Sequence, residues 1–160
     1  MGSGRRVDAG VLVEICLSSN AVLLGVEGRT HPLSEYLYHG VPVALSTDDQ
    51  GVFRIDITDE FVRAVAVQKL DYRTLKNMVR ASLEHSFLPG NSIWAARSHY
   101  DRVADVCAHD EPGDARPSPA CTQLLADNER AAMQWKLEAQ SHAFEHSIRP
   151  WRGSGRAADE

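Results

Sequence analysis

Two short apolar runs limit what this chain can fold into. Val11–Leu17 and Val41–Leu45 consist mostly of aliphatic residues, which is typical of strands covered on both faces in a parallel sheet. Residues 31–40 lie between them and predict a short helix, with Pro32 in its first turn and Gly40 as its C-cap. Strand, helix and strand with short connections indicate a parallel βαβ unit.

Two such strands cannot bury their own apolar faces without further strands beside them. The chain has 160 residues, of which 43% are hydrophobic, so its apolar content suffices for one core. Since only two convincing strands occur, we expect either a piece of a larger α/β protein or a chain that a partner completes. The first interpretation is favoured.

The second run is followed by two adjacent carboxylates, Asp48 and Asp49, and then by Gln50 and Gly51. Neighbouring carboxylates repel each other, and a metal ion or a hydrogen-bond-donating substrate is the usual reason to place them at the end of a core strand. The alternative is an Asp-Asp-Gln-Gly turn that caps the next helix. Ser18 and Ser19 follow the first strand and either line a pocket at the same edge or form a turn.

The rest of the chain predicts mainly helices. Thr58–Glu60 reads as the cap and acidic first turn of a helix of about 12 residues, and Asp71 as the cap of the next one. The expected sheet-facing residues of the first of these helices are Phe61, Val65, Ala66 and Leu70. The remaining predicted segments are the end of a helix at Asp8–Gly10, an amphipathic segment Ile93–Val106 and a long helix from about Thr122 to His146.

The composition argues against several partners. The net charge is −5 and the arginines are scattered, so we expect no nucleic-acid binding. No apolar run approaches the roughly 20 residues of a membrane span, so we expect no membrane partner.

Cys16 lies in the first strand and reads as a small core residue. Cys107 and Cys121 bracket a Pro- and Gly-rich loop and are either two free thiols or a disulfide, which would lean toward export over a cytoplasmic location.

Four motifs occur in order along the chain: Glu14–Asn20, His31–Leu33, Ser46–Asp49 and Ser82–Pro89. Their order and spacing resemble the C-terminal part of the adenosine deaminase family, including its growth-factor branch. Members are (β/α)8 barrels of the metal-dependent hydrolase superfamily. The resemblance implies an α/β fold, the C-terminal portion of a TIM barrel, with Val11–Leu17 and Val41–Leu45 as strands of the last two βα units, followed by a helical C-terminal extension.

The implied organisation has four parts: residues 1–7 as an arbitrary starting segment, 8–90 as the barrel part, 91–149 as the helical extension and 150–160 as a disordered tail. The family hydrolyses adenosine or deoxyadenosine to inosine and ammonia at a Zn²⁺ ion. By resemblance, Asp48 would ligate the metal and orient the attacking hydroxide, and Asp49 would contact N7 of the purine nucleoside. His31, whose His-Pro the family shares, is expected to have a capping and packing role rather than a site role.

The chain also departs from the family pattern. It contains no His-x-His and no His-Ala-Gly-Glu stretch, which supply the other metal ligands and the general acid in the family. Since a catalytic zinc takes about three protein ligands, we expect the chain to be inactive alone. His142 and His146 have a metal-compatible spacing but read as a solvated helix face. The alternatives are a non-catalytic remnant or interaction module, with self-association through uncovered barrel edges, and, least favoured, a Mg²⁺-binding α/β signalling module.

Overall fold

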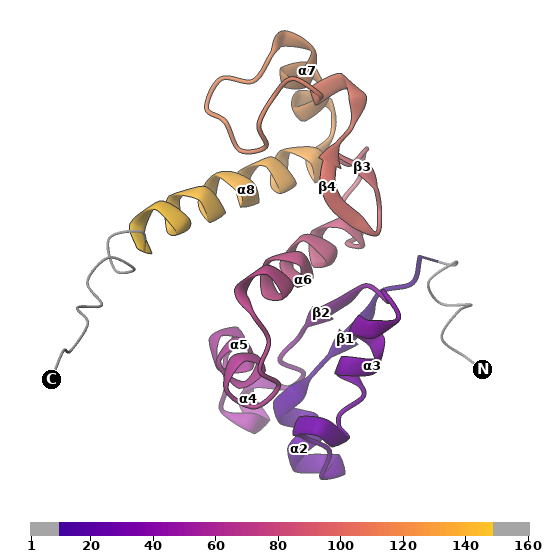
Figure 1. The fold of residues 1–160 in the computed structure, drawn as a ribbon, viewed down its shortest axis with the longest axis vertical. Coiled ribbons are helices and arrows are strands. Elements are labelled where there is room, and N and C mark those ends of the chain that lie inside the picture. Colours follow the sequence, from indigo (N-terminus) through magenta and orange to yellow (C-terminus); the bar gives the residue numbers. More distant parts are fainter. Residues whose placement is uncertain (1–9, 149–160) are drawn as a thin grey trace, which may run out of the picture. The chain divides into compact units, whose positions relative to one another are not determined.

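The computed structural model describes residues 10–148 (Figure 1). The predicted tails 1–7 and 150–160 lie outside the described residues. The chain divides into two compact units, the first comprising Met1–Phe87 with Ala96–Tyr100 and the second Leu88–Ala95 with Asp101–Glu160. The architecture is mixed α/β, with helices and a few short strands.

The first unit is built on a two-stranded parallel sheet. Strands β1 (Val13–Ile15) and β2 (Val43–Leu45) pair with Val13 opposite Val43 and Ile15 opposite Leu45. Helix α3 (Leu33–Tyr38) lies between them in sequence, and Gly40 leaves it in the left-handed region with φ 64°. The predicted parallel βαβ unit is confirmed, although each strand has three residues and is shorter than expected.

The segment after β1 differs from the prediction. A turn was one of the two interpretations of Ser18 and Ser19, yet α2 (Leu17–Leu24) includes both of them. It ends at Gly25, which adopts φ 64° and donates its N–H to the carbonyl of Ala21, as a left-handed C-cap does. A 3₁₀ turn, η1 (Gly28–Thr30), follows.

Three helices follow β2: α4 (Gln50–Phe53), α5 (Ile57–Ala66) and α6 (Tyr72–Glu84). Asp71 caps α6 as predicted, since its carboxylate accepts the N–H of Thr74. The cap of α5 is Asp56 rather than Thr58. The predicted sheet-facing residues are right at Leu70, which packs against the core, and wrong at Val65, which is 50% exposed. Glu60 and Ala64 are the fully buried residues of α5.

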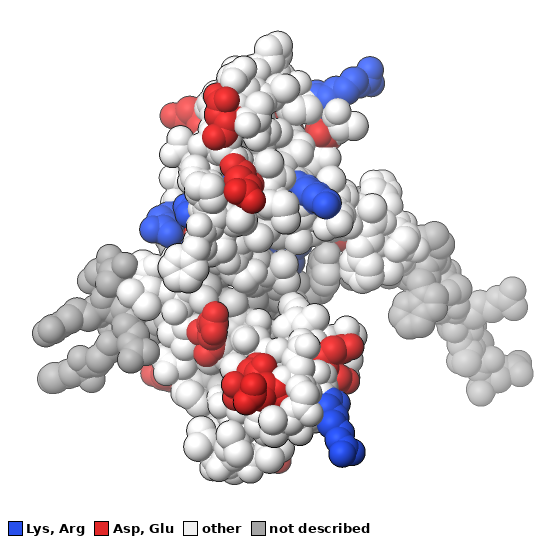
Figure 2. Space-filling view, turned by 180° about the vertical axis from the view of Figure 1, so that it is seen from behind, with Lys and Arg blue, Asp and Glu red and all other residues white. Residues whose placement is uncertain are grey.

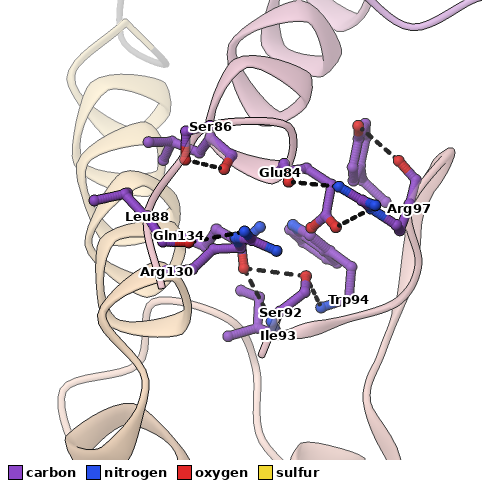
Figure 3. A network of polar contacts seen from close by, with 11 residues as sticks. Glu84, Ser86, Leu88, Ser92, Ile93, Trp94, Arg97, Arg130 and Gln134 are labelled. Atoms are coloured by element: carbon purple, nitrogen blue, oxygen red, sulfur yellow. Dashed lines mark hydrogen bonds and ion pairs between the residues drawn. The ribbon is translucent and has the colours of Figure 1, made fainter. Parts of the chain in front are cut away.

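The core of the first unit lies between the sheet and these helices, with α5 and α6 packed on β2. It consists of Ile15, Leu17, Leu33, Val43, Ala64 and Met78. At the end of α6, the buried carboxylate of Glu84 accepts from Nε of Arg97 at 3.2 Å (Figure 3). This ion pair joins residues 96–100 to the first unit.

The segment after α6 was expected to be helical, but two strands precede the helices of the second unit. Strands β3 (Trp94–Ala96) and β4 (His99–Val103) pair with each other within the segment predicted as amphipathic. After η2 (Asp105–Cys107) come α7 (Pro119–Asp127) and α8 (Glu129–Ile148). The single long helix of the prediction is broken at Asn128, whose side chain donates to the carbonyl of Leu124 and accepts from the N–H of Asn91.

Helix α8 supplies the polar and apolar groups that hold the second unit together. Oε1 of the buried Gln134 accepts from the N–H of Ile93 at 2.9 Å and from Oγ of Ser92 at 3.1 Å (Figure 3). Trp135 is nearly buried, and its indole N–H donates to the carbonyl of Asp114. The loop that contains Asp114 is therefore fixed to the helix.

The surface carries mixed charge. On the face shown in Figure 2, acidic and basic side chains of the described residues are scattered rather than gathered into one patch. Within residues 10–148, no helix combines the length and the apolar character that crossing a membrane requires.

Candidate functional site

The two carboxylates lie directly beyond the carboxyl end of β2. Asp48 has an exposed side chain and a left-handed backbone, with φ 55°. Few non-glycine residues adopt this conformation, although aspartate does so more readily than most, and Arg54 and Lys69 share it in this chain. Asp49 is the N-cap residue of α4, but its side chain makes no capping hydrogen bond. The interpretation of a turn that begins the next helix is therefore confirmed for the backbone position of Asp49, while its carboxylate takes no part in capping.

Ser19 connects the end of β1 to Asp48. Its Oγ donates to Oδ2 of Asp48 at 2.7 Å, and Ser19 itself is 4% exposed. The carboxyl ends of two parallel strands lie at the same edge of a sheet, and this bond shows that residues following both strands meet there. Ser19 thus lies in a helix and not in a turn, with its hydroxyl beside the Asp48 carboxylate.

Glu60 is a member of this cluster that sequence reasoning missed. It lies on α5, is fully buried and accepts two hydrogen bonds from the backbone that starts α2. Oε2 accepts the N–H of Leu17 at 2.7 Å, and Oε1 accepts the N–H of Ser18 at 3.0 Å. A carboxylate is favourable at a helix N-terminus because it satisfies free N–H groups and interacts with the helix dipole. Glu60 thus fixes the start of the helix that carries Ser19.

His31 has the packing role that the sequence predicts. It is 3% exposed, and Nδ1 accepts the N–H of Leu33 at 3.1 Å. The carboxamide of Asn20 lies 2.8 Å from Nε2. Burial lowers the pKa of His31, although Glu60 opposes that shift. The carboxamide atom of Asn20 that faces Nε2 is its nitrogen.

Cys16 lies between β1 and α2 and is a free thiol. Burial raises the pKa of its thiol, a hydrogen bond with Ser46 lowers it, and the nearby charge of Asp48 raises it again. The sequence predicted Cys16 as a core residue, but in the structure it is only half-buried and lies near the charge of Asp48. Its raised pKa keeps the thiol protonated near neutral pH.

The arrangement fits one metal-ligand position rather than a whole metal site. Asp48 presents an exposed carboxylate oriented by Ser19, and carboxylate oxygens are ordinary ligands of divalent metals. Among residues 10–148, the group of three His, Cys, Asp or Glu residues close enough to share an ion is Cys107, Asp110 and Cys121. Asp48, His142 and His146 do not belong to it.

Comparison with known proteins identifies the class. The family model for adenosine deaminase matches residues 5–103, which is more than half of the chain. The chain belongs to the adenosine deaminase family.

Individual relatives match over a shorter stretch. The chain is 34% identical to an aminodeoxyfutalosine deaminase of Streptomyces coelicolor over 83 residues, which is 50% of this chain and 21% of the relative. It is also 34% identical to an adenosine deaminase of Escherichia coli over 86 residues, covering 53% of this chain and 26% of the relative. The chain thus spans about a fifth to a quarter of these relatives. No solved structure matches.

Proposed function

We propose that this chain forms the last two βα units of a zinc-dependent adenosine deaminase barrel, with β1 and β2 as consecutive barrel strands. The observation that carries the proposal is the position of Asp48 and Asp49 just beyond the carboxyl end of β2, with Asp48 hydrogen-bonded to Ser19 from the end of β1. Active sites of (β/α)8 barrels lie at the carboxyl ends of their strands. The family match does not support a Mg²⁺-binding signalling module.

The two carboxylates have different tasks in this proposal. Asp48 binds the metal, while Ser19 holds its second oxygen and so fixes the orientation of the carboxylate. A bound zinc ion supplies hydroxide near neutral pH because it lowers the pKa of its water to about 7. Asp49 contacts N7 of the purine. A proton has to lie between them, since N7 and a carboxylate are both acceptors.

The proposed activity depends on groups that this sequence does not contain. A catalytic zinc has about three protein ligands, and Asp48 provides one of them. We propose that the remaining ligands and the general acid come from the other barrel strands, on a longer polypeptide or a second chain. The substrate is a 6-aminopurine nucleoside, and the two named relatives make adenosine and aminodeoxyfutalosine the first compounds to test.

The test joins this chain, genetically or by co-expression, to a segment that carries the first six βα units of a family member. Wild type should release ammonia from one of these substrates when zinc is present. Asp48→Asn should abolish turnover, and Asp49→Ala should lower kcat/KM by about 10- to 100-fold, since it removes the hydrogen bond to N7. The control Asp101→Asn changes an exposed carboxylate on β4 and should leave kcat/KM unchanged. Equal activity of Asp48→Asn and wild type would refute the proposal.

The chain without the added segment is a second test. With zinc and adenosine we expect no inosine above the blank, because one carboxylate does not hold a catalytic ion. Measurable turnover that the Asp48→Asn variant lacks would contradict the proposed incompleteness while keeping the role of Asp48.

A further inference from the structure

The second unit contains a group of potential metal ligands that the deaminase proposal does not use. Cys107 ends η2, Cys121 lies in the first turn of α7, and the two form a disulfide with Cα atoms 4.9 Å apart. Both residues are fully buried. A carboxylate oxygen of Asp110 and the two sulfur atoms all lie within 4.8 Å of one another. Two buried sulfurs and the carboxylate of the half-buried Asp110 therefore lie close together.

The backbone holds these three groups together independently of the disulfide. The N–H of Asp110 donates to the carbonyl of Cys107 at 2.9 Å, which closes the turn between them. The carboxylate of Asp110 accepts the N–H of Ser118 at 2.6 Å and its Oγ at 2.7 Å. Ser118 is also the N-cap of α7 and accepts the N–H of Cys121. Opening the disulfide would thus leave Asp110 fixed beside both thiols.

We propose that Cys107, Asp110 and Cys121 form a binding site for a thiophilic divalent cation, such as zinc, when the disulfide is reduced. A dithiol reductant supplies two electrons and two protons; the S–S bond breaks, two thiols form, and the reductant becomes a cyclic disulfide. The cation then displaces both thiol protons and binds two thiolates, with Asp110 as the third protein ligand and water as the fourth. The oxidised pair lacks thiolates and cannot bind the ion.

The two sulfur atoms have to move apart after reduction, while Asp110 already lies at a suitable distance from them. Zinc–sulfur bonds of about 2.3 Å and zinc–oxygen bonds of about 2.0–2.2 Å place tetrahedral ligands roughly 3.5–4 Å apart. The donor atoms already lie within 4.8 Å of one another. Burying two thiolates without a counter-ion would cost free energy. A bound cation would offset this cost by neutralising their charge. Asp110 already has both oxygens engaged by Ser118, and each oxygen keeps a lone pair for a metal.

The experiment uses the full chain in oxidised form and after reduction with a dithiol that is then removed under anaerobic conditions. Equilibrium dialysis against zinc should give about one equivalent bound by the reduced chain and none by the oxidised chain. Cobalt should give a thiolate charge-transfer band only in the reduced chain. Equal zinc uptake by both forms, or no uptake after reduction, would overturn the proposal.

Variants assign the site. Cys121→Ser should abolish zinc binding, and Asp110→Asn, which keeps both cysteines, should weaken it by at least 10-fold. Because Cys121→Ser could lose its fold, circular dichroism accompanies each measurement and Asp110→Asn decides: unchanged zinc affinity in that variant would refute the assigned ligand set. Cys16→Ser and Asp101→Asn are controls outside the group of Cys107, Asp110 and Cys121 and should bind like wild type. The deaminase proposal is tested by ammonia release and this one by zinc uptake of the chain alone, so failure of either proposal is distinguishable from failure of the other.

Discussion

Glu60 shows how one side chain determines the local structure of the candidate site. Its two oxygens accept the N–H groups of Leu17 and Ser18, and no water reaches it. Glu60→Ala leaves two buried donors unpaired, each at a cost of about 1–3 kcal/mol, whereas Glu60→Gln keeps one accepting oxygen and should cost less. Urea unfolding measures both effects.

The control for Glu60 is Glu35→Ala, which removes an exposed carboxylate from α3. Its pairing with His39 lies at the surface, so we expect a change within about 0.5 kcal/mol. Equal unfolding midpoints for Glu60→Ala and wild type would show that Glu60 does not stabilise α2.

His31 makes the stability of the first unit depend on pH. Burial lowers its pKa, so the unfolded chain binds the proton more readily than the folded chain. The neutral His31 contributes its full stabilisation of the folded state above the ordinary histidine pKa of about 6.5. This contribution is lost as the pH falls below that value toward the lowered pKa of the folded state. His31→Asn keeps an acceptor for the N–H of Leu33 and should flatten the decline of the urea midpoint between pH 7.5 and 5.5. An unchanged slope in this variant would contradict the assignment. His85, whose pKa burial also lowers, accounts for part of the remaining slope.

At the scale of elements, Gly113 fixes how closely its loop approaches α8. It adopts φ 95°, and a Cβ at this position would lie 2.5 Å from the backbone nitrogen of Ala139. Gly113→Ala should therefore destabilise the second unit by more than the roughly 1–2 kcal/mol that a left-handed backbone costs other residues. Thermal unfolding followed by circular dichroism measures the change.

Gly51 provides the comparison for Gly113. It lies in α4 with open space around its Cβ position, so Gly51→Ala should be neutral or stabilise by up to about 1 kcal/mol. If Gly113→Ala unfolds at the same temperature as Gly51→Ala, the close approach of the loop to α8 is not required for stability.

The elements that were predicted correctly are those whose hydrophobic periodicity and capping residues lie within the element itself or next to it in sequence. The parallel pair β1 and β2, α3, and the Asp71 cap of α6 were all predicted from periodicity and capping residues. Helix α2 was missed because its first N–H groups bond to Glu60, 42 to 43 positions away, while Ser18 and Ser19 locally favour a turn. Strands β3 and β4 were missed because they are short and mostly exposed.

The candidate site was predictable in part. Adjacent carboxylates after a buried strand drew attention to Asp48 and Asp49, and the structure places them at the edge where β1 and β2 both end. The contribution of Ser19 depends on a contact across 29 positions, which no spacing along the chain reveals. The disulfide between Cys107 and Cys121 was one of two open interpretations, and the structure shows it formed.

At the scale of the whole molecule, the disulfide is confined to the second unit. It closes a loop with a sequence separation of 14, and a loop of this size contributes about 3 kcal/mol by restricting the unfolded chain. Reduction in the presence of a chelator should therefore lower amide-exchange protection in α7 and α8 while leaving β1 and β2 protected. Loss of protection in both units together would show that they unfold as one.

The bond between the Trp135 indole and the Asp114 carbonyl has a practical consequence. The indole is 7% exposed and touches the loop that Cys107 and Cys121 close. The emission maximum of an indole moves to longer wavelength once water reaches it, so loosening of this loop would red-shift the intrinsic tryptophan fluorescence. With Trp94 and Trp151 replaced by phenylalanine, Trp135 becomes an optical reporter of the loop that needs no attached dye.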